Sequence, residues 1–290
     1  MDKEHMAIER IKLACEMSIA FYGKPMVVTV SGGKDSDVLL ELVKRSGVPF
    51  EVQHSHTTAD APQTVYHVRE QFRELENRGI HCILSKPKMT MWKLIPYNKV
   101  PPTRIIRYCC SYLKEGFGKE RHILTGVRWA ESGSRKNSRG IYEDIHKDRN
   151  KKIILNNDND DRRKWMERCE MKARTITNPI VDWKDSDVWE FIESEHLNVN
   201  PLYKCGFDRV GCIGCPAAGK KRWHEFRVFP TYKRAYLRSF ERMIEERKKV
   251  GLEVREELST PEKVFLRWMD EKDVDIQQIS FRDIYGDEDW

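Results

Sequence analysis

The chain of 290 residues is long enough for one large α/β domain with an appendage, and its hydrophobic content of 39% with eight tryptophans provides a substantial core. Charged residues make up 34% of the chain, and no apolar run approaches the roughly 18 residues of a membrane-spanning helix, which excludes an integral membrane protein. The charged N-terminus lacks the apolar core of a signal peptide, so we expect a cytoplasmic protein whose eight cysteines are thiols, catalytic groups or metal ligands.

The predicted secondary structure alternates between helices and strands. An amphipathic helix over 4–21 ends at Gly23, and the β-branched segment 27–30 that follows is typical of a strand covered on both faces. Strands separated by helices favour a doubly wound, mostly parallel α/β sheet, here with a helical C-terminal part. The other predicted strands are 49–54, 80–84 and 122–126, and the other predicted helices are 37–43, 91–95, 186–192 and one that begins at Thr260-Pro261.

The segment Ser31-Gly32-Gly33-Lys34-Asp35-Ser36, here called the glycine loop, joins the first strand to the next helix. Its glycines allow a sharp turn and a close approach of the backbone to a ligand. N–H groups at a helix start attract anions, and Lys34 with the hydroxyls of Ser31 and Ser36 adds charge and donors around a phosphate or sulfate. The spacing differs from the Walker sequence Gly-x-x-x-x-Gly-Lys, so we do not expect a P-loop NTPase. A purely structural turn is the alternative.

A polar loop over 55–62 follows the second predicted strand at its carboxyl end, where α/β sheets bind ligands. Thr57, Thr58 and Asp60 in this loop are candidates for contacts with adenosine or a substrate. Helix capping before Pro62 explains any one of them equally well.

The segment 136–163 is polar, and we predict an insertion or a mobile loop there. A metal site in its Asn- and Asp-rich centre, 156–161, is an alternative, but the spacing is not that of an EF-hand. Farther along the chain, we expect Asp182 or Asp185 to cap the helix at 186–192.

The net charge of +6 is unevenly distributed. Residues 204–250 contain thirteen Lys/Arg and five Asp/Glu, a local charge of +8, whereas residues 251–290 contain five and twelve, a local charge of −7. The basic block is a candidate surface for anions or nucleic acid, and a solvated helix face is the alternative.

Aromatic residues are interleaved with the charges of this basic block, as in proteins that stack bases while they bind phosphates. For Phe226 and Tyr236 we prefer the alternative that they form helix core. The four aromatic candidates are Trp223, Phe226, Tyr232 and Tyr236.

Two cysteine pairs, Cys109-Cys110 and Cys212-x-x-Cys215, have spacings that suit a metal or a cluster. Tetrahedral thiolate sites hold zinc or an iron–sulfur cluster, and a redox Cys-x-x-Cys is a third explanation. The spacing alone does not choose among these. Cys15 and Cys82 lie in apolar runs, where packing alone explains them. The roles of Cys169 and Cys205 are open, and either is an alternative to one member of these pairs.

Together these features resemble the phosphoadenosine phosphosulfate reductase family of PP-loop proteins, over about 27–243. In that family the PP-loop, which the glycine loop matches, grips the pyrophosphate of ATP or the sulfate end of an adenylylated sulfate. The glycine loop and the cysteine pairs are the specific marks. The other matching segments are Arg107-Tyr108, Thr125–Arg128 with Glu131, Ser132 and Arg135, Asn178–Trp183 with Asp187-Val188-Trp189, and Gly211–Pro216.

The resemblance implies a [4Fe–4S] cluster. It also implies a PP-loop nucleotide-binding α/β domain over 1–200, followed over 201–290 by a cysteine-containing helical region that is first basic and then acidic. The implied cluster ligands are Cys109, Cys110, Cys212 and Cys215.

The resemblance further implies an adenine nucleotide at the carboxyl edge of the sheet. The residues expected to act in catalysis are Lys34, Asp35 and Arg128, with Arg128 and Arg135 binding anions. The full set of expected nucleotide-binding residues is Ser31, Gly32, Gly33, Lys34, Asp35, Ser36, Thr57, Thr58, Asp60, Gly126, Arg128 and Arg135.

One feature departs from the reductases of this family, which carry a nucleophilic cysteine near the C-terminus, whereas here no cysteine follows Cys215. Ser or Asp cannot replace a thiol nucleophile at neutral pH. The chain is therefore more similar to relatives that use ATP to activate a group for sulfur insertion, such as the ATP pyrophosphatases of DNA phosphorothioation and tRNA thiolation. That similarity implies ATP with Mg²⁺, a nucleic-acid acceptor (DNA or tRNA), and a cysteine desulfurase or another sulfur donor.

Two alternatives stay open. One is a reductase that releases sulfite from an adenylylated sulfate, with Cys205 or Cys169 as its nucleophile. The other is a non-catalytic, nucleotide-binding cluster protein within a larger complex. Oligomerisation is compatible with each of them.

Overall fold

The structure is a computed structural model that describes residues 2–114, 118, 120–146, 152–156 and 172–270. The chain forms two compact units, each assembled from segments that are separate in the sequence. The predicted boundary between domains after residue 200 stays a prediction. The first unit contains Met1–Ser55, Pro62–Ser85 and Phe117–Gly211, and the second contains His56–Ala61, Lys86–Gly116 and Cys212–Trp290.

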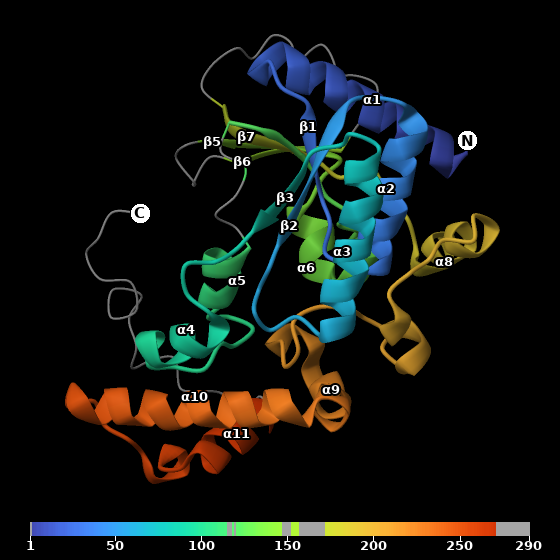
Figure 1. The fold of residues 1–290 in the computed structure, drawn as a ribbon. Coiled ribbons are helices and arrows are strands. Elements are labelled where there is room, and N and C mark those ends of the chain that lie inside the picture. The colour runs from blue at the N-terminus through green and yellow to red at the C-terminus, as the bar shows by residue number, and fades with distance from the viewer. Residues whose placement is uncertain (1, 115–117, 119, 147–151, 157–171, 271–290) are drawn as a thin grey trace. The chain divides into compact units, whose positions relative to one another are not determined.

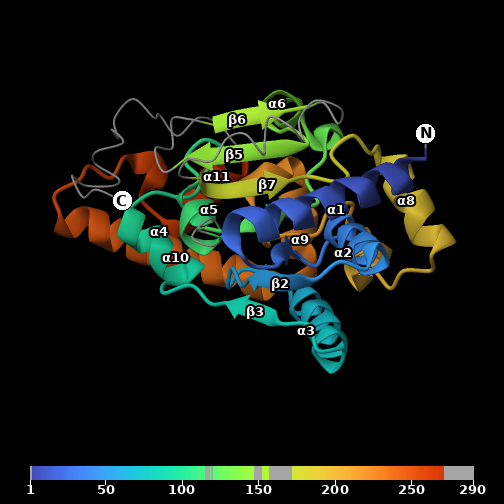
Figure 2. The same ribbon diagram turned by 90° about the horizontal axis from the view of Figure 1, so that it is seen from above.

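The first unit is built on a sheet whose seven strands, among the described residues, follow the order β3-β2-β1-β4-β7-β5-β6 (Figure 2). Neighbouring strands from β3 to β7 are parallel, whereas β5 runs antiparallel to both β7 and β6. This confirms the expected mostly parallel sheet. The strands are β1 (Met26–Thr29), β2 (Phe50–Ser55), β3 (Cys82–Ser85), β4 (His122–Leu124), β5 (Tyr142–His146), β6 (Lys152–Leu155) and β7 (Lys172–Thr177).

The longer helices of this unit bury apolar residues against the sheet and one another. Met26 and Val28 of β1 are fully buried and belong to one continuous core with apolar residues of α1, α2 and α8. The helical segments are α1 (Lys3–Tyr22), α2 (Lys34–Ser46), α3 (Pro62–Asn77), α6 (Gly133–Ser138) and α8 (Asp185–Ser194), with the short 3₁₀ segments η1 (Trp129–Glu131) and η2 (Pro201–Cys205).

The strand order reverses between β1 and β4. From β1 the chain proceeds through β2 to β3 on one side, and the later strands β4 and β7 lie on the other side. In open α/β sheets, loops at the carboxyl ends of the strands separate at such a point and leave room for a ligand. The glycine loop follows β1 and the segment Thr125–Arg128 follows β4, so the fold brings these two predicted segments to the same point.

The prediction of a loop over 136–163 is wrong for most of its described part. Residues of this segment form the end of α6 and the antiparallel pair β5–β6 at the edge of the sheet. Glu143 and Asp144 make β5 look polar in sequence, but both are buried, and Glu143 accepts hydrogen bonds from Arg139 and Asn178. Of the Asn- and Asp-rich centre considered for a metal site, 156–161, all but the first residue lie outside the described residues.

The second unit consists of helices around an aromatic core. Helix α10 packs along α4 and α11 (Figure 1), and Tyr236 of α10 stacks at 4.8 Å, ring centre to ring centre, from Trp268 of α11. Phe226 and Tyr236 are buried, which confirms that they are core residues. The elements are α4 (Met91–Asn98), α5 (Tyr108–Leu113), η3 (Pro216–Lys221), α9 (Arg222–Val228), α10 (Pro230–Lys249), η4 (Glu256–Leu258) and α11 (Pro261–Asp270).

None of the helices in the described part of the chain has both the length and the apolar character required to span a membrane.

Candidate active site

The glycine loop is shaped by close packing and by hydrogen bonds from its surroundings. Gly32 has a φ of +73°, and a Cβ atom there would lie 2.8 Å from Cγ2 of Thr64 in α3. Only glycine suits this position, because other residues rarely adopt that φ and have no room for a side chain. The buried Asn200 donates from Nδ2 to the carbonyl oxygen of Gly32 at 2.9 Å, which fixes the turn.

The hydroxyls of the loop bond mainly to the loop itself. Ser36 Oγ accepts the N–H of Ser31 at 3.2 Å and donates to the carbonyl of Gly33 at 2.7 Å. At the start of α2, the N–H of Lys34 donates to the hydroxyl of Tyr203 at 2.9 Å. Burial raises the pKa of Tyr203, so this hydroxyl stays neutral at physiological pH. These hydrogen bonds set the shape of the loop.

Four charged side chains meet beside the loop, and we call them the charge cluster: Lys34, Asp35, Arg128 and Asp185. Asp185 Oδ1 lies 2.9 Å from Lys34 Nζ and 2.9 Å from Arg128 Nη2, and Arg128 Nε donates to Asp35 Oδ1 at 2.7 Å. The two cations are almost entirely buried, with 5% and 2% of Lys34 and Arg128 exposed. Lys34 and Arg128, which the sequence placed in one site, therefore share a partner atom.

Burial and ion pairing act against each other in this cluster. Burial disfavours the charged form of Arg128, but the charge of Asp35 and hydrogen bonds to both carboxylates outweigh it and raise the arginine pKa. Burial likewise opposes ionisation of Asp185, but hydrogen bonds from Lys34 and Arg128 outweigh it and lower the pKa of that carboxyl. Arg128 and Asp185 are therefore both charged at neutral pH.

Gly126 allows the segment after β4 to reach the start of α2. A Cβ atom at this position would lie 2.7 Å from the carbonyl oxygen of Asp35, closer than real contacts allow. Arg135, the other expected anion-binding residue of this segment, pairs instead with Glu131 in the neighbouring turn, and burial lowers the pKa of its guanidinium.

The capping prediction for α8 is wrong. The N-cap residue is Lys184, and Asp187 in the first turn of the helix accepts its N–H at 2.6 Å. Asp182 pairs with Arg10 of α1, and Asp185 belongs to the charge cluster. The sequence did not reveal the role of Asp185 in the charge cluster, because a carboxylate at the start of a helix is usually explained as a helix cap. It also did not reveal the roles of Asn200 and Tyr203: Asn-Pro at 200–201 signals a turn, but nothing local connects Tyr203 to the glycine loop.

The four predicted cluster ligands lie in the second unit, and we call them the thiol cluster: Cys109, Cys110, Cys212 and Cys215. The Cys109 thiol donates a hydrogen bond to Cys110, which raises the pKa of Cys109 and lowers that of Cys110 to about 5. Burial raises the pKa of Cys212, and charges on Cys212 and Cys215 act on Cys109 as well. The cysteines of both sequence pairs therefore interact electrostatically, and none of them is in a disulfide.

Basic and hydroxyl groups surround these sulfur atoms. Arg107 Nη2 donates to Cys110 Sγ at 3.4 Å, and the charge of Cys212, followed by that of Asp60, raises the pKa of the Lys114 ammonium. Cys212 Sγ donates to Thr57 Oγ1 at 3.3 Å. Four thiols with adjacent cations match the needs of an anionic thiolate-bound centre, so this donor set suits an iron–sulfur cluster.

Helix α10 holds the segments that carry this site. The hydroxyl of Tyr232 donates to the carbonyl of Asp60 at 2.5 Å, and that of Tyr236 donates to the carbonyl of Ile213 at 2.9 Å. Next to Cys215, Gly214 has a φ of +77°, and a Cβ there would lie 2.6 Å from Phe226. The thiol-bearing turn is thus fixed against the aromatic core.

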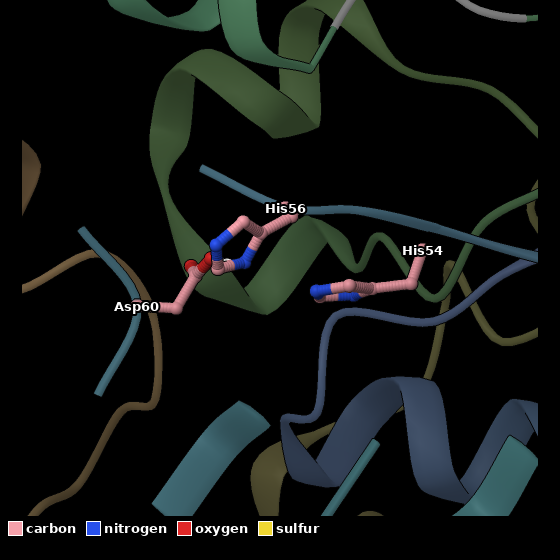
Figure 3. A group of neighbouring side chains, drawn as sticks. All are labelled: His54, His56 and Asp60. Carbon is pink, nitrogen blue, oxygen red and sulfur yellow. Dashed lines mark ion pairs between the residues drawn. The ribbon is translucent and has the colours of Figure 1, made fainter. Parts of the chain in front are cut away.

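The polar loop 55–62 contributes its side chains to the second unit. Thr57 Oγ1 donates to Asp60 Oδ1 at 2.6 Å, and His56 Nδ1 lies 3.3 Å from Asp60 Oδ2 (Figure 3). Burial opposes ionisation of Asp60, but these partners outweigh it and lower its pKa. Thr58 Oγ1 accepts the N–H of Met91 at the start of α4. Contacts of these residues with adenosine stay a prediction. His54, also drawn in Figure 3, belongs to β2, where its Nδ1 donates to the carbonyl of Val30.

Residues 25–218 match the model of the phosphoadenosine phosphosulfate reductase domain. An uncharacterized protein of Methanocaldococcus jannaschii is 26% identical over 204 residues, which cover 67% of this chain and 36% of that protein. The chain therefore spans well under half of that relative's length. The adenosine 5′-phosphosulfate reductase of Geobacillus kaustophilus is 25% identical over 211 residues, covering 68% of this chain and 74% of that enzyme.

Among solved structures, the phosphoadenylyl-sulfate reductase of Candida auris is similar with a TM-score of 0.44 and 15% identity, over 71% of this chain and 87% of that one. The domain match includes the glycine loop, Arg128, Asp185 and all four members of the thiol cluster, and it extends over well more than half of the sequence. The chain belongs to the phosphoadenosine phosphosulfate reductase family.

Proposed function

We propose that this chain is an adenylating ATP pyrophosphatase of sulfur transfer, which activates a group of a nucleic acid for the insertion of sulfur. The observation that carries the proposal is the pair of buried cations, Lys34 and Arg128, beside the glycine loop at the start of α2. Buried cations next to a helix N-terminus bind and stabilise the oxygens of phosphates.

In the first step, an oxygen of the acceptor attacks the α-phosphorus of ATP. A new oxygen–phosphorus bond forms, the bond from the α-phosphorus to the bridging oxygen breaks, and its electron pair leaves with pyrophosphate. The glycine loop would hold the leaving pyrophosphate, and Lys34 and Arg128 would stabilise the negative charge that grows on it. Asp35 orients the guanidinium of Arg128 for this role through its 2.7 Å hydrogen bond. Mg²⁺ would accompany the nucleotide and neutralise part of its charge.

In the second step, the terminal sulfur of a persulfide on a cysteine desulfurase or another donor attacks the activated atom of the acceptor. A bond to sulfur forms, and AMP leaves with the electron pair of the bond to oxygen. A thiol of the donor or of a reducing partner then attacks the donor's own sulfur atom, so that the sulfur–sulfur bond breaks, a disulfide forms on that side, and the thiolated acceptor is released. The basic segment 204–250 is our candidate for holding the acceptor, DNA or tRNA, because Trp223 is 40% exposed there among lysines and arginines. We therefore propose base stacking for Trp223 rather than for the buried Phe226.

The thiol cluster would hold a [4Fe–4S] cluster. When bound, such a cluster supplies electron transfer or a Lewis-acidic iron that binds sulfur. The chain's own contribution is a cationic and hydrogen-bonding environment: Arg107 and Lys114 face the thiols, and Thr57 accepts from Cys212. These groups would balance the negative charge of four thiolates.

The experiment is a measurement of pyrophosphate release from ATP by protein purified without oxygen, with DNA and tRNA offered as acceptors. We expect release that rises with one nucleic acid and stops when Lys34 is replaced by alanine. Binding of ATP without release under any condition would instead support a non-catalytic, nucleotide-binding role.

A reductase that releases sulfite is the second candidate. It is favoured by the similarity to adenosine 5′-phosphosulfate reductases and by the exposed Cys205. Cys205 ends η2, the segment that also supplies Tyr203 to the glycine loop. Sulfite formation from an adenylylated sulfate and reduced thioredoxin, lost in Cys205→Ser, would establish it. Loss in Cys169→Ser would point to that cysteine instead, and it lies outside the described residues.

A further inference from the structure

The Asp185 carboxylate occupies a position that an oxyanion ligand would take. One oxygen, Oδ1, lies 2.9 Å from both Lys34 Nζ and Arg128 Nη2 and so bridges the two buried cations. A phosphate oxygen bound by the same two residues would use these same donors. The charge cluster contains two cations and two carboxylates, so without a ligand its charges already balance.

The two carboxylates of the cluster differ in how firmly they are held. Asp35 lies next to Lys34 in α2, its side chain is 23% exposed, and it bonds to Arg128 Nε. The side chain of Asp185 is 63% exposed and lies at the first position of α8. Because Asp187, and not Asp185, accepts the N–H of Lys184 at the start of α8, the Asp185 side chain can rotate into solvent without removing this bond.

We propose that Asp185 is a specificity-determining residue that competes, from within the chain, with the ligand for Lys34 and Arg128. It keeps the two buried cations paired when the site holds no phosphate, and a ligand must displace it in order to bind. This inference rests on the proposed function in so far as that function places phosphates at these cations.

The competition has a defined consequence for affinity. When only a fraction of the molecules has an open site, the apparent dissociation constant equals the intrinsic one divided by that fraction. If Asp185 occupies the cations in about 90% of the molecules, about one tenth are open and binding is about tenfold weaker. The same competition assists the departure of pyrophosphate, because the carboxylate returns to the cations as the product leaves. A ligand that binds the loop backbone as well as the two cations gains enough free energy to displace Asp185. Free sulfate or phosphate makes fewer contacts and displaces Asp185 poorly.

The test is calorimetric titration of the full chain with inorganic pyrophosphate in the absence of divalent cations. Asp185→Asn removes the competing charge at nearly constant shape, and we expect it to bind pyrophosphate about tenfold more tightly than the unmodified chain. Asp185→Glu restores a competing carboxylate and is expected to return the affinity toward the original value. Asp187→Asn is the matched control: it removes the same charge from the same turn of α8 without touching Lys34 or Arg128, and its affinity should change less than about twofold.

Equal or weaker binding by Asp185→Asn would overturn the inference, and so would a gain in Asp187→Asn as large as that in Asp185→Asn. These outcomes leave the proposed function intact, provided that the unmodified chain binds pyrophosphate and loses it in Lys34→Ala. If neither the unmodified chain nor Asp185→Asn binds pyrophosphate, both the inference and the phosphate role of the glycine loop are wrong. Thermal unfolding of each variant shows whether a loss of binding comes from a loss of structure.

Discussion

The charge cluster of the first unit and the thiol cluster of the second are built in opposite ways. The charge cluster carries its own counter-ions, because Asp35 and Asp185 balance Lys34 and Arg128. The thiol cluster instead places four cysteine thiols beside two cations, Arg107 and Lys114. Four thiolates would carry more negative charge than these two cations balance. The charge cluster is therefore suited to a ligand that exchanges with solvent, and the thiol cluster to a positively charged metal centre that stays bound.

The largest expected effect concerns the proposed [4Fe–4S] cluster. Replacing Cys212 by serine removes one of its four proposed thiolate ligands, and we expect bound iron and inorganic sulfide to fall to near zero. Pyrophosphate binding in the first unit should persist, since the charge cluster contains none of these cysteines. Iron and sulfide analysis with calorimetry measures both. Cys15→Ser, which changes a cysteine in the core beside α2, is the control and should keep its iron.

The second prediction concerns the formation of pyrophosphate at the charge cluster. Lys34→Ala and Arg128→Met each remove one of the two cations, and we expect the rate of pyrophosphate formation to fall roughly 10²–10³-fold, because each loses stabilisation of charge at the leaving group. Bound iron should not change. A loss of iron in Lys34→Ala or Arg128→Met would contradict this prediction, because it would mean that the charge cluster and the thiol cluster do not bind their ligands independently.

A smaller effect is expected where the segment Thr125–Arg128 lies against the glycine loop. Gly126→Ala places a methyl group 2.7 Å from the carbonyl oxygen of Asp35, and we expect a loss of about 1–3 kcal/mol in the free energy of unfolding together with weaker pyrophosphate binding. Gly133→Ala is the matched control, because no atom lies within 4 Å of its new methyl group. Denaturant unfolding of both variants measures the difference.

The smallest effect is expected from Tyr203→Phe. This change leaves the N–H of Lys34 without its hydroxyl acceptor in a partly buried position, at a cost of about 1 kcal/mol. Pyrophosphate binding by Tyr203→Phe should change less than in Lys34→Ala, since Tyr203 positions the loop and carries no charge. A larger loss than in Lys34→Ala would mean that the tyrosine itself contacts the ligand.

The sequence predicted the elements with strong local patterns. The β-branched strand at 27–30, the glycine loop and the cysteine pairs are all contiguous, and their neighbours along the chain supply the signal. Strand β5, which lies between β7 and β6, escaped prediction because its buried Glu143 makes it look polar in sequence, whereas one of its hydrogen-bond partners, Asn178, lies 35 residues farther along the chain. The role of Asp185 escaped prediction for the same reason: its partners lie more than fifty residues away in sequence, at Lys34 and Arg128.

The hydrogen bonds from α10 have a consequence for how the proposed iron–sulfur cluster would be loaded. Tyr232 and Tyr236 hold the backbone at Asp60 and Ile213, and Gly214 is packed against Phe226. None of these contacts uses a thiol of the thiol cluster, so we expect them to hold the cysteine-bearing segments in place before a cluster binds. Loading should proceed as an exchange of ligands from a carrier to a waiting set of sulfurs, with little change in circular dichroism of the backbone, and should be repeatable after mild oxidative loss of the centre.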